Sequence, residues 1–506
     1  MTTRLALCLL SALCGCSLGH DGSAAKAIRP NILLIYTDDH GWADLGVQGV
    51  DQDVRTPNLD RLADDGVVFE RGYVTAPQCT PSRAGVLTGM YQNRFGVERN
   101  GIPMPSEVVT LPERLKQAGY VSGISGKWHL DVEASSNHAP RRNRFLPELL
   151  PHRQGFDEYF TGFLQDYIAS HALDGTPFPD APRLVSEEGC RVVIQTEAAL
   201  SFLERREPNP EQPWFFYLAY TAPHFPLESP EPWFSQTPED LPVKRRQALA
   251  MIGAIDDGVG RLREKLRAMG QEQNTLIFFI GDNGAPLGAG WDGSINWPMR
   301  GGKNMLSEGG IRVPFVAAWP GHIPAGRVYE RPVISLDVAA TALALSGMGS
   351  QPVVPDAART GSLGADPTGG KPIPPAPSPL DGVNLMPFLT GEKPGVPHET
   401  LYWRWMSQAA VQEFPWKLIA LGDRERLLFD VTHPDGESVS GNLIATQPAI
   451  AARLEAKLEG WCDTLEPPGL PASFDRNQEK LFAEHGIIAA PAGAAGSGGS
   501  KPEGSR

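Results

Sequence analysis

Several short polar clusters in this chain of 506 residues could bind a metal ion or transfer a proton. Asp38 and Asp39 form one cluster, and Asp282 and Asn283 form another. Together they offer the hard oxygen ligands that Ca²⁺ or Mg²⁺ prefers, and no sequence-local group of cysteine and histidine indicates zinc. His224, in the segment Ala-Pro-His, adds an imidazole that titrates near neutral pH. A single aspartate in a loop is more often a cap or a turn, so the metal interpretation requires these groups to lie together.

Cys79 stands at the start of a predicted helix. Pro81 follows two residues later and suits a first helical turn, where its missing N–H group would have no partner. The cysteine would lie at the positive end of the helix dipole, beside free backbone N–H groups that favour anions. For a lone cysteine, simple capping and packing is the commoner explanation.

The elements that must position these residues are those of an α/β fold. From Pro30 onward, short apolar runs alternate with segments of helical period, which is typical of βαβ units and a mostly parallel, helix-covered sheet. The pattern predicts strands at 31–36, 214–220, 275–280 and 314–319, and helices at 57–65, 189–205 and 241–269. The clusters at 38–39, 224 and 282–283 follow three of these strands. Open α/β sheets bind ligands beyond the carboxyl ends of their strands, so we expect one shared site.

The motif Cys79-x-Pro81-x-Arg83, followed by AGVLTG, resembles the modification motif of the type I, formylglycine-dependent sulfatases. The resemblance runs from Arg29 to about Leu465 and is to the arylsulfatase and N-acetylgalactosamine-6-sulfatase type. It implies the alkaline phosphatase-like fold, a mixed, mostly parallel sheet sandwiched by helices, with a smaller C-terminal α+β subdomain. It also implies that a separate maturase oxidises the cysteine to Cα-formylglycine, whose hydrated gem-diol is the nucleophile.

The resemblance further implies a bound Ca²⁺, with Mg²⁺ less favoured, held by Asp38, Asp39, Asp282, Asn283 and the formylglycine oxygen at Cys79. A sulfate ester is negatively charged, so it repels an incoming oxygen unless cations neutralise that charge. Lys127, in GKWH, and Lys303, in RGGK, match the sulfate-binding lysines of the family. Arg83, one helical turn from the cysteine, is expected to orient the diol and the metal ligands.

The reaction also needs a base and an acid. His129 and His224 both follow predicted strands and match family positions. By the family's mechanism, His129 would deprotonate the second diol hydroxyl and expel sulfate, while His224, with Lys303, would protonate the leaving oxygen. We expect His40, beside the carboxylate pair, to support the site or the fold.

The first residues predict an export signal. Arg4 supplies a positive charge, and the apolar run 5–13 is too short to anchor the chain across a bilayer. Two processing sites compete, a lipobox-like one ending at Cys16 and an A-x-A site at 25–27. The protein would thus be periplasmic, either lipid-anchored through Cys16 or not, or secreted.

Charge and composition exclude other classes. Lys and Arg total 45 against 59 Asp and Glu, which argues against a nucleic-acid-binding or polybasic membrane-surface protein. Hydrophobic residues at 41% and charged residues at 21% are typical of a folded protein without transmembrane spans. An anionic substrate must therefore be met by local positive charge.

We expect a leader at 1–27, a catalytic domain at 28–380, a C-terminal subdomain at 381–488 and a disordered tail at 489–506. The catalytic domain would contain a loop rich in proline and glycine at 351–379. Strand-like alternation at 401–430 predicts a hairpin, and 448–465 predicts a helix. Apart from Cys79, the body has two cysteines, Cys190 and Cys462, which are either free or paired.

Export favours a sulfated carbohydrate as substrate, with aryl sulfates as surrogates. Basic residues gather between positions 138 and 153, namely Arg141, Arg142, Arg144 and Arg153 with His138 and His152. They belong either to a solvated loop or to a subsite for a second sulfate or a uronate. Four tryptophans could stack on sugars or pack in the core, namely Trp291, Trp297, Trp403 and Trp405. One alternative function is a phosphate or phosphonate monoester hydrolase of the same superfamily. Another is a non-catalytic protein that binds sulfated glycans, in which the cysteine would stay unmodified.

Overall fold

The computed structural model describes residues 29–131, 146–348, 380–471 and 476–490. The expected leader, the loop at 351–379 and residues 491–506 of the expected tail lie outside these ranges. Of the basic residues between positions 138 and 153, His138, Arg141, Arg142 and Arg144 also lie outside them.

A ten-stranded mixed sheet forms the centre of the molecule, in the order β11-β2-β10-β9-β1-β8-β4-β5-β6-β7. Its bounds are β1 (Asn31–Asp38), β2 (Val67–Phe69), β4 (Val121–Gly126), β5 (Glu158–Gly162), β6 (Asp166–Ala169), β7 (Arg183–Ser186), β8 (Trp214–Pro223), β9 (Thr275–Gly281), β10 (Phe315–Ala318) and β11 (Arg327–Tyr329). The central strands β9, β1, β8, β4 and β5 are mutually parallel, and β10, β6 and β7 are joined antiparallel. The prediction of a mixed, mostly parallel sheet is confirmed.

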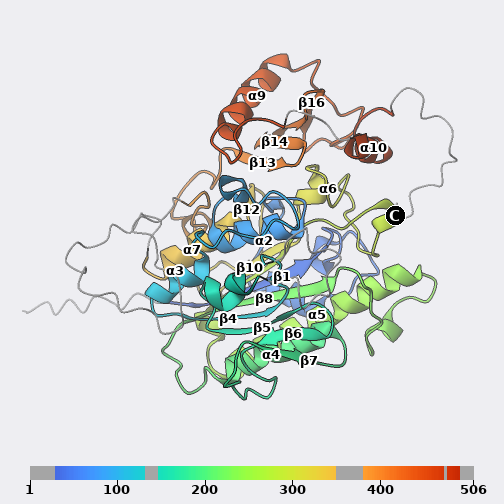
Figure 1. Ribbon diagram of the computed structural model, residues 1–506. Coiled ribbons are helices and arrows are strands. Elements are labelled where there is room, and N and C mark those ends of the chain that lie inside the picture. Colours follow the sequence, from blue (N-terminus) through green and yellow to red (C-terminus); the bar gives the residue numbers. More distant parts are fainter. Residues whose placement is uncertain (1–28, 132–145, 349–379, 472–475, 491–506) are drawn as a thin grey trace, which may run out of the picture.

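The central strands β1, β8 and β9 are buried along their whole length, and mostly apolar, because both faces of the sheet are covered. One face packs against α1 (Pro57–Asp64), α4 (Arg191–Glu204) and α5 (Val243–Ala268). The other packs against α2 (Cys79–Thr88), α3 (Leu111–Gln117) and α7 (Leu336–Leu345) (Figure 1). In α1, Leu59, Leu62 and Ala63 are buried on one face, as their spacing predicts.

A separate antiparallel sheet lies toward the C-terminus, over the side of the molecule that carries α2 and α6 (Glu308–Ile311) (Figure 1). It comprises β13 (Leu401–Trp405), β14 (Gln408–Glu413), β15 (Trp416–Leu421) and β16 (Glu425–Asp430), so the predicted hairpin is extended to four strands. The remaining strands and α-helices are β3 (Gly72–Tyr73), β12 (Val333–Ile334), α8 (Met386–Leu389), α9 (Pro448–Cys462) and α10 (Arg476–Glu484).

Several open alternatives are decided by the packing. Cys190 and Cys462 are both free, so they do not pair. Trp403 and Trp405 are buried in the core rather than available to a sugar, whereas Trp297 is 52% exposed. Within the described ranges, no helix combines the length and the apolar character needed to cross a membrane.

Candidate active site

The carboxyl ends of three adjacent parallel strands bring the first polar clusters together. Asp38 ends β1, His224 directly follows β8, and Asp282 directly follows β9. The backbone N–H of Asp282 donates to the carbonyl of Thr37 at 2.8 Å, and that of His224 donates to the carbonyl of Asp38 at 3.2 Å. The pairing of β1 with β8 is irregular between Tyr36 and Asp38, just before this edge. The strand ends therefore place a histidine and two carboxylates side by side.

The helix α2 brings Cys79 to this edge. The helix begins at Cys79, after Gln78 in extended conformation, and no side chain caps it. The thiol donates to Asp38 Oδ1 at 3.4 Å, and Lys303 Nζ lies 3.6 Å from Sγ. Burial and the charge of Asp282 raise the pKa of the Cys79 thiol to about 12. The group is therefore a neutral thiol, a poor nucleophile in its unmodified form.

Ligand atoms of Asp38, Asp39, Cys79 and Asp282 all lie within 4.8 Å of one another, and all four residues are buried. Asn283 adjoins them, since its Nδ2 donates to Asp39 Oδ1 at 2.6 Å. Its buried Oδ1 has no hydrogen-bond partner among the described residues. Three carboxylates and a free amide oxygen are the donor set of a hard divalent cation, so these residues fit such an ion.

A separate cation faces each carboxylate. Lys127 Nζ lies 2.7 Å from Asp38 Oδ2, and Lys303 Nζ lies 2.7 Å from both Asp39 oxygens. Burial opposes ionisation of Asp38, yet Lys127, His224, Arg83 and Lys303 together outweigh it and hold the pKa of this carboxyl well below its ordinary value. The site thus keeps buried negative charge only by surrounding it with fixed positive charge.

Arg83 faces the third carboxylate, that of Asp282, and so connects α2 to the group of possible metal ligands. Its Nε and Nη2 both donate to Asp282 Oδ2, at 3.1 and 2.7 Å. Its Nη1 donates to the carbonyl of Lys127 at 3.1 Å. The guanidinium is buried, so this residue links α2, the end of β9 and the segment after β4.

The two histidines differ in their surroundings. His129 is buried, and its Nδ1 has no partner among the described residues. Burial, with Lys127 and Arg83, holds its pKa well below the ordinary value, so the ring is neutral and can accept a proton. The side chain of His224 is 25% exposed, and its Nε2 lies 3.6 Å from Asp39 Oδ2. His40, by contrast, is engaged at both ring nitrogens, by Thr37 Oγ1 and the carbonyl of Asp44, which suits a supporting role.

Comparison with known proteins identifies the family. The sulfatase family model matches residues 30–348, which is well over half of the chain. The chain belongs to the sulfatase family. As the resemblance implied, this sulfatase is a sulfuric ester hydrolase with the fold of alkaline phosphatase-like enzymes.

Its relatives include sulfatases of different sources. It is 33% identical over 400 residues to N-acetylgalactosamine-6-sulfatase of Homo sapiens, covering 73% of this chain and 67% of the human one. It is 31% identical over 309 residues to arylsulfatase J of Mus musculus, covering 58% of this chain and 48% of the mouse protein.

Among solved structures, the sulfatase is similar to Ps i-CgsB in complex with k-i-k-neocarrahexaose, with a TM-score of 0.70 and 27% identity over 90% of this chain and 97% of that one. The phosphonate monoester hydrolase SpPMH from Silicibacter pomeroyi shares the fold, with a TM-score of 0.57 and 23% identity over 85% of this chain and 94% of that one.

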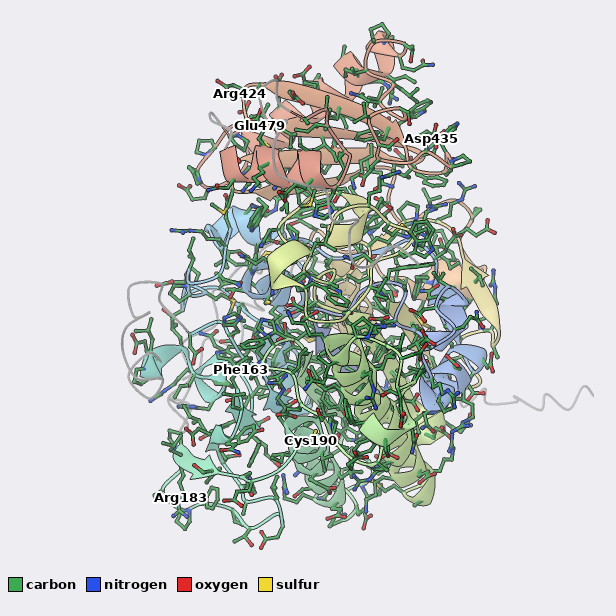
Figure 2. The ribbon with its side chains drawn as sticks, turned by 90° about the vertical axis from the view of Figure 1, so that its right-hand side faces the viewer. Phe163, Arg183, Cys190, Arg424, Asp435 and Glu479 are labelled. Atoms are coloured by element: carbon green, nitrogen blue, oxygen red, sulfur yellow. The ribbon has the colours of Figure 1, made fainter. Side chains whose placement is uncertain are left out.

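Two residues of the sulfatase site had no signal in the sequence. The Phe163 ring, labelled in Figure 2, makes an edge-to-face contact with the His224 imidazole, with centroids 5.7 Å apart. Lys127 Nζ lies 5.9 Å from the centroid of the same ring, and the Arg191 guanidinium lies 5.7 Å from it. Arg191 is buried and donates to the His224 carbonyl. Neither residue lies in a polar motif, and only the packing of α4 and the segment after β5 beside β8 brings them here.

Backbone conformation is a further feature of the site. Asp39, His129 and Asn304 are non-glycine residues with φ of 58°, 61° and 71°. Left-handed backbone is uncommon outside glycine, although aspartate, asparagine and histidine adopt it more readily than other types. Such residues gather at functional sites because the surrounding structure holds them there. These three lie beside Asp282, Lys127 and Lys303. We call the three carboxylates and the cations that face them the charge cluster, namely Asp38, Asp39, Asp282, Lys127, Lys303 and Arg83.

Proposed function

We propose that this sulfatase hydrolyses sulfate esters of carbohydrates, and aryl sulfates as surrogates, at a formylglycine made from Cys79. The observation that carries the proposal is the position of Sγ at the start of α2. It lies within reach of Asp38 and Lys303 and inside the cluster of metal-type ligands. No other described cysteine has such neighbours, and a maturase would be required to oxidise this one.

A divalent cation, Ca²⁺ rather than Mg²⁺, would be held by Asp38, Asp39, Asp282, Asn283 and the modified side chain at 79. When bound, it would supply positive charge next to the sulfate and the attacking oxygen. The free amide oxygen of Asn283 supports this assignment, because a buried acceptor without a donor is costly unless a cation satisfies it.

The chain's own residues would then do the following. Lys127 and Lys303 would neutralise the charge of the sulfate group that the oxygen at residue 79 approaches. Arg83 would keep Asp282 oriented through its paired hydrogen bonds. The neutral ring of His129 would take a proton from the hydroxyl at residue 79 and so release sulfate. His224, with Lys303, would donate a proton to the leaving oxygen.

The relatives support a carbohydrate substrate. One relative's name specifies the 6-sulfate of N-acetylgalactosamine, and one similar structure was solved with a neocarrahexaose. The leader expected at 1–27 would deliver the protein to the periplasm, with or without a lipid anchor at Cys16, or outside the cell, where such polymers occur. We likewise propose a catalytic domain at 28–380 and a C-terminal subdomain at 381–488.

The test compares nitrophenyl sulfate, nitrophenyl phosphate and phenylphosphonate with protein produced beside a formylglycine-generating maturase. We expect the sulfate to turn over fastest and peptide mass spectrometry to find residue 79 as the aldehyde. Cys79→Ala should abolish turnover, whereas Cys190→Ala should not. A preference for phosphate or phosphonate would favour the alternative function of a phosphate or phosphonate monoester hydrolase. An intact thiol with no turnover, but tight binding of sulfated saccharides, would favour the binding-protein alternative.

A further inference from the structure

The segment from Lys303 to Glu308 lies between the charge cluster and the C-terminal sheet. At its start, Lys303 Nζ contacts Asp39 and the thiol of Cys79. The segment lies more than twenty residues beyond the end of β9, so the central sheet does not hold it directly. A flexible lysine on such a segment needs another element to fix its backbone.

The catalytic domain supplies part of that support. The backbone N–H of Lys303 donates to the carbonyl of Ala285 at 3.0 Å, and that of Asn304 donates to the carbonyl of Pro77 at 2.9 Å. Asn304 Oδ1 accepts from Gln78 Nε2 at 3.1 Å. The contacts of Asn304 join the segment to the residues just before Cys79, but they leave the carbonyl of Asn304 and the N–H of Leu306 for another partner.

Gln408, the first residue of β14, supplies that partner and is fully buried. Its Nε2 donates to the carbonyl of Asn304 at 2.9 Å, and its Oε1 accepts from the N–H of Leu306 at 2.7 Å. A side-chain amide that both donates and accepts fixes two backbone positions at once. The first of them belongs to the left-handed residue directly after Lys303.

The same sheet holds the other end of the segment through charge. Lys417, in β15, is buried and lies 2.9 Å from Glu308 Oε1 and 2.8 Å from Glu437 Oε1. The N–H of Glu308 donates to the second oxygen of Glu437. Both Asn304–Leu306 and Glu308 are thus attached to the C-terminal part of the chain, at β14, β15 and Glu437.

We propose that Gln408 is a positioning residue for the reaction, which keeps the Lys303 ammonium beside residue 79 by holding the backbone of Asn304 and Leu306. On this basis the C-terminal sheet contributes to the geometry of the active site. The inference rests on the proposed function, in which Lys303 acts on the sulfate group. Misplacement of such a group by about 1 Å can cost on the order of a hundredfold in rate.

The test is a double-mutant cycle on the full chain, with Gln408→Met, Lys303→Ala and the double variant assayed for kcat/KM on nitrophenyl sulfate. Methionine is close to glutamine in size but lacks the amide. We expect Gln408→Met to lower kcat/KM by about tenfold to a hundredfold, and to have no further effect once Lys303 is alanine.

The matched control is Gln271→Met. Gln271 is also buried, and its Oε1 accepts from Asn31 Nδ2 at 3.2 Å and from Trp214 Nε1 at 3.1 Å, at the N-terminal ends of β1 and β8. It should lower the melting temperature as Gln408→Met does and leave kcat/KM within about twofold, as expected of a change that touches no reacting group. If Gln408→Met does not fold, Gln408→Asn keeps a buried amide that is too short to bridge both partners, and it should give the same non-additivity.

Multiplicative effects of the Gln408 and Lys303 changes would overturn the inference, as would equal effects of the Gln408 and Gln271 changes on kcat/KM. A distinct outcome marks failure of the proposed function itself. In that case Lys303→Ala would leave turnover unchanged, and the role of Gln408 would fall with it.

Discussion

Lys127 Nζ lies 2.7 Å from Asp38 Oδ2, and the two side chains are only 6% and 0% exposed. Asp38 also lies beside Arg83, with 3.9 Å between Nη2 and Oδ1. Water cannot replace either cation at this depth, so the carboxylate depends on its protein partners and on any metal ion in the adjoining cluster.

Replacing Lys127 by methionine should destabilise the metal-free protein by about 3–5 kcal/mol, because the buried carboxylate loses its closest partner. Chemical unfolding in the presence of a chelator measures this loss, and added Ca²⁺ should restore part of it. Lys265→Met is the control. Its partner Glu207 is 51% exposed, and such a surface pair contributes about 1 kcal/mol or less. Equal losses in the two variants would show that the buried pair has no special weight.

Calcium should stabilise chelator-treated protein by an amount that grows with the logarithm of its concentration above Kd, about 2.7 kcal/mol at a hundredfold excess. Thermal unfolding at increasing Ca²⁺, repeated with Mg²⁺, measures the preference for the ion. Asn283→Ala should weaken the response, since it removes the free amide oxygen. Asp256→Asn should preserve the response, because that carboxylate accepts hydrogen bonds from Asn58 and Leu59 elsewhere in the fold. A response unchanged by Asn283→Ala would remove this residue from the ligand set.

His224→Gln should slow the turnover of a substrate more, the higher the pKa of its leaving alcohol. For alkyl or sugar sulfates the loss should reach about 10²–10⁴-fold, the usual contribution of one proton transfer. For nitrophenyl sulfate it should be much smaller, because nitrophenolate leaves without a proton. His433→Gln, at a side chain that is 57% exposed, is the control. A uniform loss across all leaving groups would argue against the acid role.

The contact between His398 and Asp337 should make stability depend on pH. His398 Nε2 lies 2.7 Å from Asp337 Oδ1. Burial opposes protonation, but the carboxylate outweighs it and raises the pKa of His398 above its ordinary value of 6.5. The folded state therefore favours the protonated ring. Its contribution is complete below pH 6.5 and is lost as pH rises through the higher folded pKa.

The test measures the melting temperatures of the native protein and of His398→Gln at pH values from below 6.5 to above the folded pKa of His398. The difference between them should be largest at low pH and should shrink as pH rises. A difference that grows with pH would have the wrong sign and would contradict the assignment. Asp337 should remain engaged in both proteins, since it also accepts from the N–H groups of Ile334 and Val383.

Local pattern was enough to predict the elements that lead to the site. The apolar runs that became β1, β8 and β9 are buried on both faces, so their sequences carry no competing period. The start of α2 at Cys79 could likewise be predicted, because the first-turn proline acts within a few residues. The direction of β10 could not be predicted, because an apolar run looks the same in a strand that is parallel to its neighbour and in one that is antiparallel.

The sequence alone determined the inventory of chemical groups, namely the carboxylates, lysines, histidines and the cysteine that short motifs place after strands and at a helix start. Only the tertiary structure decided what surrounds them. Phe163, Arg191 and Gln408 come from segments with no polar motif, and they reach the site through packing between elements far apart in the chain. Such contacts leave no trace in local periodicity, because they depend on how whole elements pack rather than on neighbouring residues.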